Sequence, residues 1–159
     1  MKTTSNTGWI SKTALFVGAG VAVIVVGVLA SHSVASSSIP RLLRESDSAR
    51  MNGDVQEEER LLSCVVEEDP GNTAAFQRLA VLSRGAGRYA SSAVLWHRVG
   101  RLDPLALGAR KEEALNLMAA GFVEDVISLL EPVERDVDET VMLARAYLMS
   151  GRIEDANRL

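Results

Sequence analysis

The chain has 159 residues, which is room for one domain and an appendage, and 47% of them are hydrophobic while only 4% are aromatic. Residues 1–38 contain two lysines and no acidic residue, whereas residues 39–159 contain the other 15 of the 17 basic residues and all 21 acidic residues. This acidic majority argues against a nucleic-acid partner, which needs clustered lysine and arginine. Cys64 is the only cysteine, so no internal disulfide can form, and its apolar neighbours predict a buried thiol.

An uncharged apolar run, TALFVGAGVAVIVVGVLA, covers residues 13–30. Eighteen helical residues span about 27 Å, close to the thickness of the hydrocarbon core of a membrane. With an extension to His32, we predict a single transmembrane helix over residues 13–32, between an N-terminal tail (1–12) and a serine-rich linker (33–38). A cleaved signal peptide is the alternative, with small residues near Ala30 or Ala35 as the cleavage site, although the apolar part of such a peptide usually has about 7–15 residues.

The flanking charges indicate an orientation for this helix. Lys12 lies directly before the span and the tail is short, which favours an N-terminus inside the cell. In a bacterium, the rest of the chain would then lie in the periplasm, held at the inner membrane. Ala14, Gly18 and Ala22 place a small residue at every fourth position, a pattern that permits close packing of a partner helix, although glycine and alanine are also simply common in membrane helices.

Four glycines mark a repeat in the rest of the chain. They are separated by 34, 34 and 30 residues, and an apolar residue follows each one by two positions: Gly53, Gly87, Gly121 and Gly151. A period near 34 is typical of helical repeat arrays. Each glycine lies between two stretches with helical apolar periodicity, where a turn needs a residue that tolerates positive φ. We therefore predict an all-α array of three to four helical hairpins.

One unit carries a recognisable motif. Residues 73–106 place a large residue, a Leu-small pair, Gly-x-Tyr, a small residue, an aromatic residue and Asp-Pro in order, at Phe76, Leu79, Ala80, Gly87, Tyr89, Ser92, Trp96, Asp103 and Pro104. The chain resembles the tetratricopeptide repeat (TPR) family, which implies an α-solenoid with a groove and units at 39–72, 73–106, 107–136 and, incomplete, 137–159. Three departures are Ser83 at a usual large position, Glu45 at a usual leucine position, and Pro132 inside the second helix of the third unit, where it should bend the helix.

The register predicts how the units pack. Small residues at Ala80, Ala114 and Ala144 should let the two helices of a hairpin approach closely, and Trp96 and Leu130 should fill space between units. The residues two positions after the glycines should cap the turns, namely Tyr89, Val123 and Ile153. The sequence stops about one turn into the last helix, so Leu143 and Tyr147 should lack part of their cover. Either the natural chain continues beyond this point, or another protein completes the stack.

Signals of catalysis are absent from the sequence. It contains no metal-spaced His/Cys cluster and no nucleotide-binding glycine loop, so we expect no metal, cofactor or small-molecule substrate, and no enzyme. His97 is predicted to be a surface residue because no acid or nucleophile is spaced to act with it. The acidic runs 57–59 and 67–69 point around their helix axes, which predicts solvated faces and not cation sites.

The resemblance implies that the first helix of each unit lines a groove that binds a peptide or helix of another protein. The groove residues that it indicates are Gln77, Arg78, Val81, Arg84, Lys111, Glu112, Leu115, Met118, Val141, Met142 and Arg145, although several of them could instead pack between units. We therefore predict a non-catalytic, membrane-anchored scaffold whose partners include integral membrane proteins. The alternatives are a permanent accessory subunit of a large membrane complex and a secreted TPR protein released by signal cleavage.

Overall fold

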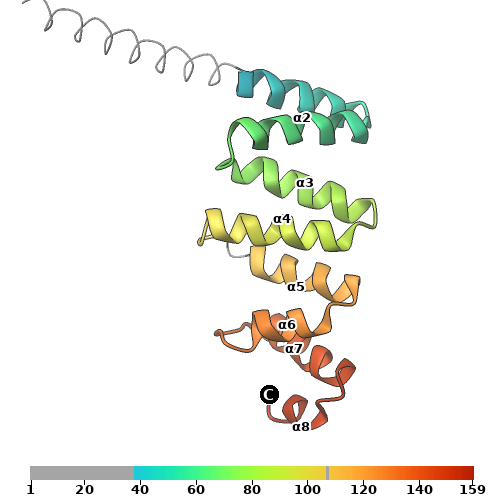
Figure 1. The fold of residues 1–159 in the computed structure, drawn as a ribbon, viewed down its shortest axis with the longest axis vertical. Coiled ribbons are helices and arrows are strands. Elements are labelled where there is room, and N and C mark those ends of the chain that lie inside the picture. The colour runs from blue at the N-terminus through green and yellow to red at the C-terminus, as the bar shows by residue number, and fades with distance from the viewer. Residues whose placement is uncertain (1–37, 107) are drawn as a thin grey trace, which may run out of the picture. The chain divides into compact units, whose positions relative to one another are not determined.

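The computed structural model describes residues 38–106 and 108–159 (Figure 1). The predicted tail and transmembrane helix, with Ala14, Gly18 and Ala22, and the linker up to residue 37 lie outside the described residues. Within the described ranges, no helix is both long enough and apolar enough to cross a membrane.

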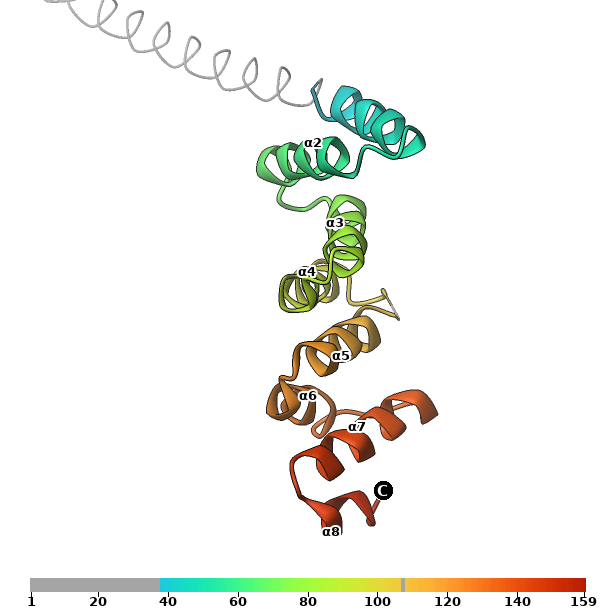
Figure 2. The same ribbon diagram turned by 90° about the vertical axis from the view of Figure 1, so that its right-hand side faces the viewer.

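All regular secondary structure in these ranges is helical, which confirms the predicted all-α class. A helix over residues 38–51 is followed by seven others: α2 (Val55–Glu68), α3 (Thr73–Gly85), α4 (Tyr89–Leu102), α5 (Ala109–Ala120), α6 (Val123–Leu130), α7 (Val137–Met149) and α8 (Ile153–Ala156). Residues 42–159 belong to one structural unit. Within it, successive helices alternate between two rows, one with α3, α5 and α7 and the other with α2, α4, α6 and α8 (Figure 2).

The four glycines form the turns within the hairpins, as predicted. Each has a positive φ, between 73° and 82°. At every turn the glycine N–H donates to the carbonyl three residues earlier, and the next N–H donates to the carbonyl five residues earlier, as in Gly87 to Arg84 and Arg88 to Ser83. This shared bonding satisfies carbonyls that the helix end would otherwise leave without partners. The repeat is therefore present in the backbone hydrogen bonds as well as in the sequence.

Packing between the helices follows the predicted register only in part. Ala80 and Ala114 are fully buried and Leu130 fills space between helices, as expected. In the last pair the fully buried small residue is Ala146, while the predicted Ala144 keeps partial exposure. The predicted capping role is wrong for Tyr89 and Ile153, whose side chains are exposed.

Two predictions about individual residues of the core also need correction. Trp96 is only partly buried, because it stands beside a cavity and does not fill the space between units. Cys64 is half-buried, not fully buried.

The predicted bend at Pro132 does not occur, because α6 ends at Leu130, two residues before the proline. The proline thus follows a helix of only eight residues. The predicted lack of cover for Leu143 and Tyr147 is also wrong. Both are buried in a core shared by α5, α6 and α7, in which α6 contributes Val126, Ile127 and Leu130.

Candidate functional site

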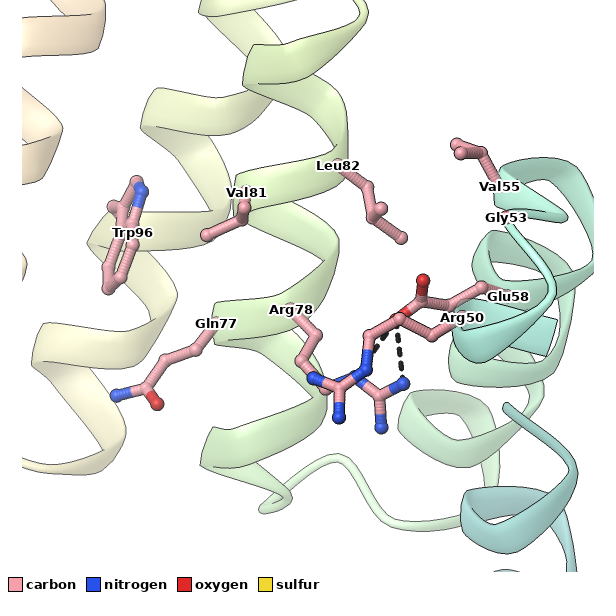
Figure 3. A pocket seen from close by; sticks show the side chains of 9 residues that line it. All are labelled: Arg50, Gly53, Val55, Glu58, Gln77, Arg78, Val81, Leu82 and Trp96. Carbon is pink, nitrogen blue, oxygen red and sulfur yellow. Dashed lines mark hydrogen bonds and ion pairs between the residues drawn. The ribbon is translucent and has the colours of Figure 1, made fainter. Parts of the chain in front are cut away.

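A cavity of about 520 Å³ lies between the helix over residues 38–51 and helices α2, α3 and α4 (Figure 3). Its apolar side chains come from three helices: Val55 from α2, Val81 and Leu82 from α3, and Trp96 from α4. Val81 remains 49% exposed, so the apolar surface of the cavity is open to solvent. The other residues that line it are Arg50, Gly53, Glu58, Gln77 and Arg78.

One side of the cavity is held by a network of ion pairs. The Nε and Nη2 groups of Arg78 donate to Oε1 of Glu58 at 3.1 and 2.6 Å, and Nη1 donates to Oδ1 of Asp47 at 2.8 Å. Glu58 is only 3% exposed, so its carboxylate has little contact with water and is bonded to this arginine instead. Three helices are thereby joined at one guanidinium, and the side of the cavity that they form is fixed in place.

The other side of the cavity carries unused hydrogen-bonding capacity. Gln77 of α3 and Trp96 of α4 both line this part of the cavity (Figure 3). The amide of Gln77 makes no hydrogen bond to any described residue, and Nε1 of Trp96 is buried without a partner among those residues. An amide can both donate and accept, which suits it to the backbone of a bound peptide.

Eight of the eleven predicted groove residues share one face of α3, α5 and α7. They lie three, six or ten residues before a turn glycine, and these spacings put side chains on the same side of a helix. We call this the groove face; its members are Gln77, Val81, Arg84, Lys111, Leu115, Met118, Val141 and Arg145. The cavity lies at one end of this face, with Gln77 and Val81 in its lining.

The other three predicted residues lie nine positions before a glycine and face neighbouring helices. Arg78 makes the ion pairs described above, and Met142 is buried in the core of the last repeats. Glu112 accepts a hydrogen bond from Nη1 of Arg84 at 2.5 Å, which joins α5 to α3. These residues pack against neighbouring helices, and Arg78 also lines the cavity.

Some members of the groove face form ion pairs with other residues of the chain, and others do not. Lys111 donates to Asp138 of α7, and this hydrogen bond raises the pKa of the lysine. Arg84 is held by Glu112, as described above. Arg145 is exposed and makes no ion pair with a described residue. Three aliphatic members are exposed as well, namely Val81, Leu115 and Val141.

The carboxylates of the acidic run 57–59 diverge, as predicted, but the predicted solvated face is wrong for Glu58, which is buried. The three carboxylates point in different directions and find different partners, because Glu57 pairs with Arg60, Glu58 with Arg78, and Glu59 with Arg88. Glu58 is therefore a buried part of the cavity. Sequence reasoning missed it, since its partner lies 20 residues away on another repeat.

His97 lies on the surface, as predicted, but it has an acidic neighbour that the sequence did not reveal. Its Nδ1 lies 3.0 Å from Oε1 of Glu113, which belongs to the next repeat. Burial raises the pKa of the Glu113 carboxyl. Among the described residues, no group of three or more His, Cys, Asp or Glu side chains is placed to hold a metal ion.

Comparison with known proteins gives no sequence family. No family model matches the chain, and no curated protein matches it. Solved structures do match. MamA from Desulfovibrio magneticus RS-1 covers 74% of this chain and 69% of its own length, with 16% identity and a TM-score of 0.60. A Podospora anserina protein described as a kinesin light chain with nearly identical TPR-like repeats covers 74% and 71%, with 23% identity and a TM-score of 0.55.

The fold is TPR-like. The O-GlcNAc transferase of Thermobaculum terrenum is similar over 71% of this chain at 28% identity, with a TM-score of 0.50, but the match spans only 21% of that enzyme. The likeness therefore concerns the repeats and leaves the remaining four fifths of the transferase unmatched. Together with the four glycine turns, these neighbours support the TPR resemblance at the level of fold.

Proposed function

We propose that the TPR-like repeats form a non-catalytic scaffold that binds a peptide segment of another protein at the groove face. The observation that carries this proposal is the open apolar cavity at Val55, Val81 and Trp96. Its volume of about 520 Å³ lies within the range of about 300–1,000 Å³ that is usual for binding pockets. A bound apolar side chain would remove Val81 from water, and this burial would favour association.

The surroundings of the cavity support binding without large rearrangement. Arg78 connects three helices through Glu58 and Asp47, so one side of the cavity is already ordered before a partner arrives. A preordered site loses less conformational entropy on binding. On the opposite side, Gln77 offers an amide to a partner backbone.

The test uses two valines that differ in position. Val81→Asp places a charge in the cavity, and Val94→Asp makes the same change on α4 in the other row of helices, where Val94 is 69% exposed. Each full-length variant is cross-linked in native membranes and purified, and its partners are quantified by mass spectrometry. We expect Val81→Asp to lose the partners that wild type and Val94→Asp retain. Equal recovery with both variants would rule out the cavity as the binding site.

We further propose that residues 13–32 anchor these repeats in a membrane, with the N-terminus inside and, in a bacterium, the repeats in the periplasm. The apolar run and the position of Lys12 support this placement. Ser91→Cys in a Cys64→Ala background provides a single exposed thiol on the repeats. A membrane-impermeant maleimide applied to intact cells with a permeabilised outer membrane should label it, and labelling only after lysis would place the repeats inside.

A permanent accessory subunit of a membrane complex is a second candidate. It is favoured by exposed apolar side chains on the last two helices, namely Val141, Leu148, Met149 and Ile153. Such surface is typical of lasting protein contacts. Stoichiometric recovery of integral membrane proteins with Met1 retained would select this candidate, and loss of that set in a Gly18→Leu variant would place the contact at the small-residue face of the anchor. A mature N-terminus near Ser31 or Ser36 would instead select the secreted form.

A further inference from the structure

The two rows of helices differ in charge. We call residues 42–51 with α3, α5 and α7 the first row, and α2, α4, α6 and α8 the second row (Figure 2). The first row has seven basic and six acidic residues, whereas the second row has three basic and nine acidic residues. The acidic excess of the repeats therefore lies in the second row, while the row that carries the groove face has a slight basic excess.

The carboxylates close to the groove face are already paired. Asp47 is bonded to Arg78, Glu112 to Arg84, and Asp138 to Lys111. Glu112 and Asp138 are thus each compensated by one cation of the protein, whereas Asp47 shares Arg78 with Glu58 and has Arg50 as a second, more distant cation at 4.0 Å. They offer little attraction to a basic partner.

Two exposed cations of the first row lie on the side of the groove face, whereas Arg44, which is also exposed and makes no ion pair with a described residue, lies nine residues before Gly53, at the position of Arg78. Arg50 lies three residues before Gly53, at the position that Arg84 holds before Gly87, and it lines the cavity. It is 62% exposed, and its nearest acidic oxygen, on Asp47, is 4.0 Å away and already bonded to another arginine at 2.8 Å. Arg145 on α7 is exposed and makes no hydrogen bond or ion pair with a described residue.

Exposed aliphatic side chains lie between these two cations along the repeats. Val81 and Leu115 hold the same position, six residues before their glycines, as Arg145 does before Gly151. Val141 lies one turn before Arg145 on the same helix face. The surface thus combines exposed aliphatic side chains with an exposed cation near each end, while Arg84 and Lys111 between them are paired with Glu112 and Asp138.

We infer that the groove face selects apolar peptide segments that carry acidic side chains, which pair with Arg50 and Arg145. This inference rests on the proposed scaffold function and names the chemistry of its partner. An acidic segment would be repelled by the second row, so its charge would direct it to the groove face. The chain's own residues 1–38 contain no acidic residue, so they do not have this chemistry.

A random peptide library tests the inference without knowledge of the natural partner. The full chain is purified in detergent, immobilised, and used to select displayed peptides of sixteen residues, which reach about 50 Å when extended. We expect the selected peptides to combine aliphatic residues with Asp or Glu. For a synthetic copy of such a peptide, Arg50→Glu and Arg145→Glu should each weaken binding by about five-fold, the upper size of an exposed ion pair.

A matched control and a rescue separate charge from folding. Arg101→Glu makes the same change at an exposed residue of α4 in the second row and should leave the affinity unchanged. A peptide with lysine in place of each acidic residue should bind the Arg50→Glu/Arg145→Glu double variant more tightly than it binds wild type. Rescue of this kind requires a folded protein, so it excludes unfolding as the cause of the loss.

Other results would overturn the inference in distinguishable ways. If the selected peptides are basic or neutral, or if both arginine variants bind as wild type does, the acidic preference is wrong. In that case loss of binding in Val81→Asp would still support the groove as an interaction site. If Val81→Asp also leaves peptide binding unchanged, or if no peptide is enriched, both the inference and the proposed scaffold function fail.

Discussion

Arg78 on α3 donates two hydrogen bonds to a single carboxylate oxygen of Glu58 on α2, from Nε at 3.1 Å and from Nη2 at 2.6 Å. The two residues belong to successive repeats, and the carboxylate is almost completely buried. Because a buried charge without a partner is costly, this pair couples the packing of the two repeats to the geometry of the cavity.

Replacing Glu58 by glutamine should destabilise the repeats by about 2 kcal/mol, because Arg78 then loses its closest anionic partner and a buried amide takes the place of the carboxylate. Glu57→Gln is the matched control, since its side chain is exposed and pairs with Arg60 on the same helix. We expect its urea midpoint to stay close to that of wild type. Urea unfolding followed by circular dichroism measures both, and equal midpoints for the two variants would contradict a structural role for the Glu58–Arg78 pair.

The last repeats should show a pH dependence that comes from Glu139. Its hydrogen bonds with Arg110, at 2.8 Å through both carboxylate oxygens, hold the pKa of Glu139 below its ordinary value of about 4.3. A lowered pKa in the folded state means that the stabilisation is present above the unfolded pKa and is lost as the pH falls through the folded pKa. Arg110→Gln should therefore lower the unfolding free energy at pH 7, and its difference from wild type should shrink below about pH 4. A difference that is constant over this range would assign the effect to packing.

The helical hairpins could be predicted from the sequence because they depend on local signals. A turn glycine at positive φ, small residues such as Ala80 and Ala114, and apolar periodicity each act within one hairpin, and they recur in every unit. The resulting fold depends on few contacts between residues that are far apart in the sequence, because each repeat contacts only its neighbours. This is why the glycine spacing and the apolar periodicity together predict the fold class.

The cavity and its ion pairs could not be predicted in the same way. Arg78 lies 20 residues from Glu58 and 31 from Asp47, and such contacts carry no periodic signal. The burial of Leu143 was not predicted, because it depends on how α6 packs on α7. That packing depends in turn on the short length of α6, which ends at Leu130, two residues before Pro132. To predict contacts between units, one must know how the helices are placed relative to one another, and sequence patterns do not give that placement.

Gly87→Ala should lower stability by about 1 kcal/mol, because Gly87 has φ +74° and a Cβ disfavours that conformation. The new methyl group would meet no atom within 4 Å, so the cost comes from the backbone alone. Gly85→Ala, two residues earlier in α3, also adds a methyl group to open space but at a helical φ, and it should stabilise by about 0.5 kcal/mol. Opposite shifts of the two thermal midpoints are expected, and shifts in the same direction would contradict this account.

Tyr147 should ionise only at unusually high pH. Its hydroxyl donates to Oε1 of Glu131 at 2.7 Å, and this hydrogen bond raises the pKa of the phenol above its ordinary value of about 10. The chain has only two tyrosines, so in a Tyr89→Phe background the absorbance of phenolate reports Tyr147 alone. Glu131→Gln should lower the measured pKa, because the hydrogen bond then goes to a neutral acceptor. A raised pKa means that the folded state loses stability as the pH rises through this range. A titration that is the same with and without Glu131 would exclude the hydrogen bond as the cause.

The last repeat should depend on Leu143 for its stability, although the sequence suggested that this residue lacks cover. Leu143 is 0% exposed among residues of α5, α6 and α7, so Leu143→Ala leaves a cavity and should cost about 3 kcal/mol. Leu148→Ala makes the same change on the same helix at a side chain that is 57% exposed, and it should change the unfolding free energy by less than about 1 kcal/mol. Hydrogen exchange of the α7 amides locates the effect, because loss of the core should increase exchange in α6 and α7 before it reaches α3. If the two alanine variants unfold at the same urea concentration, α6 does not cover α7 in solution.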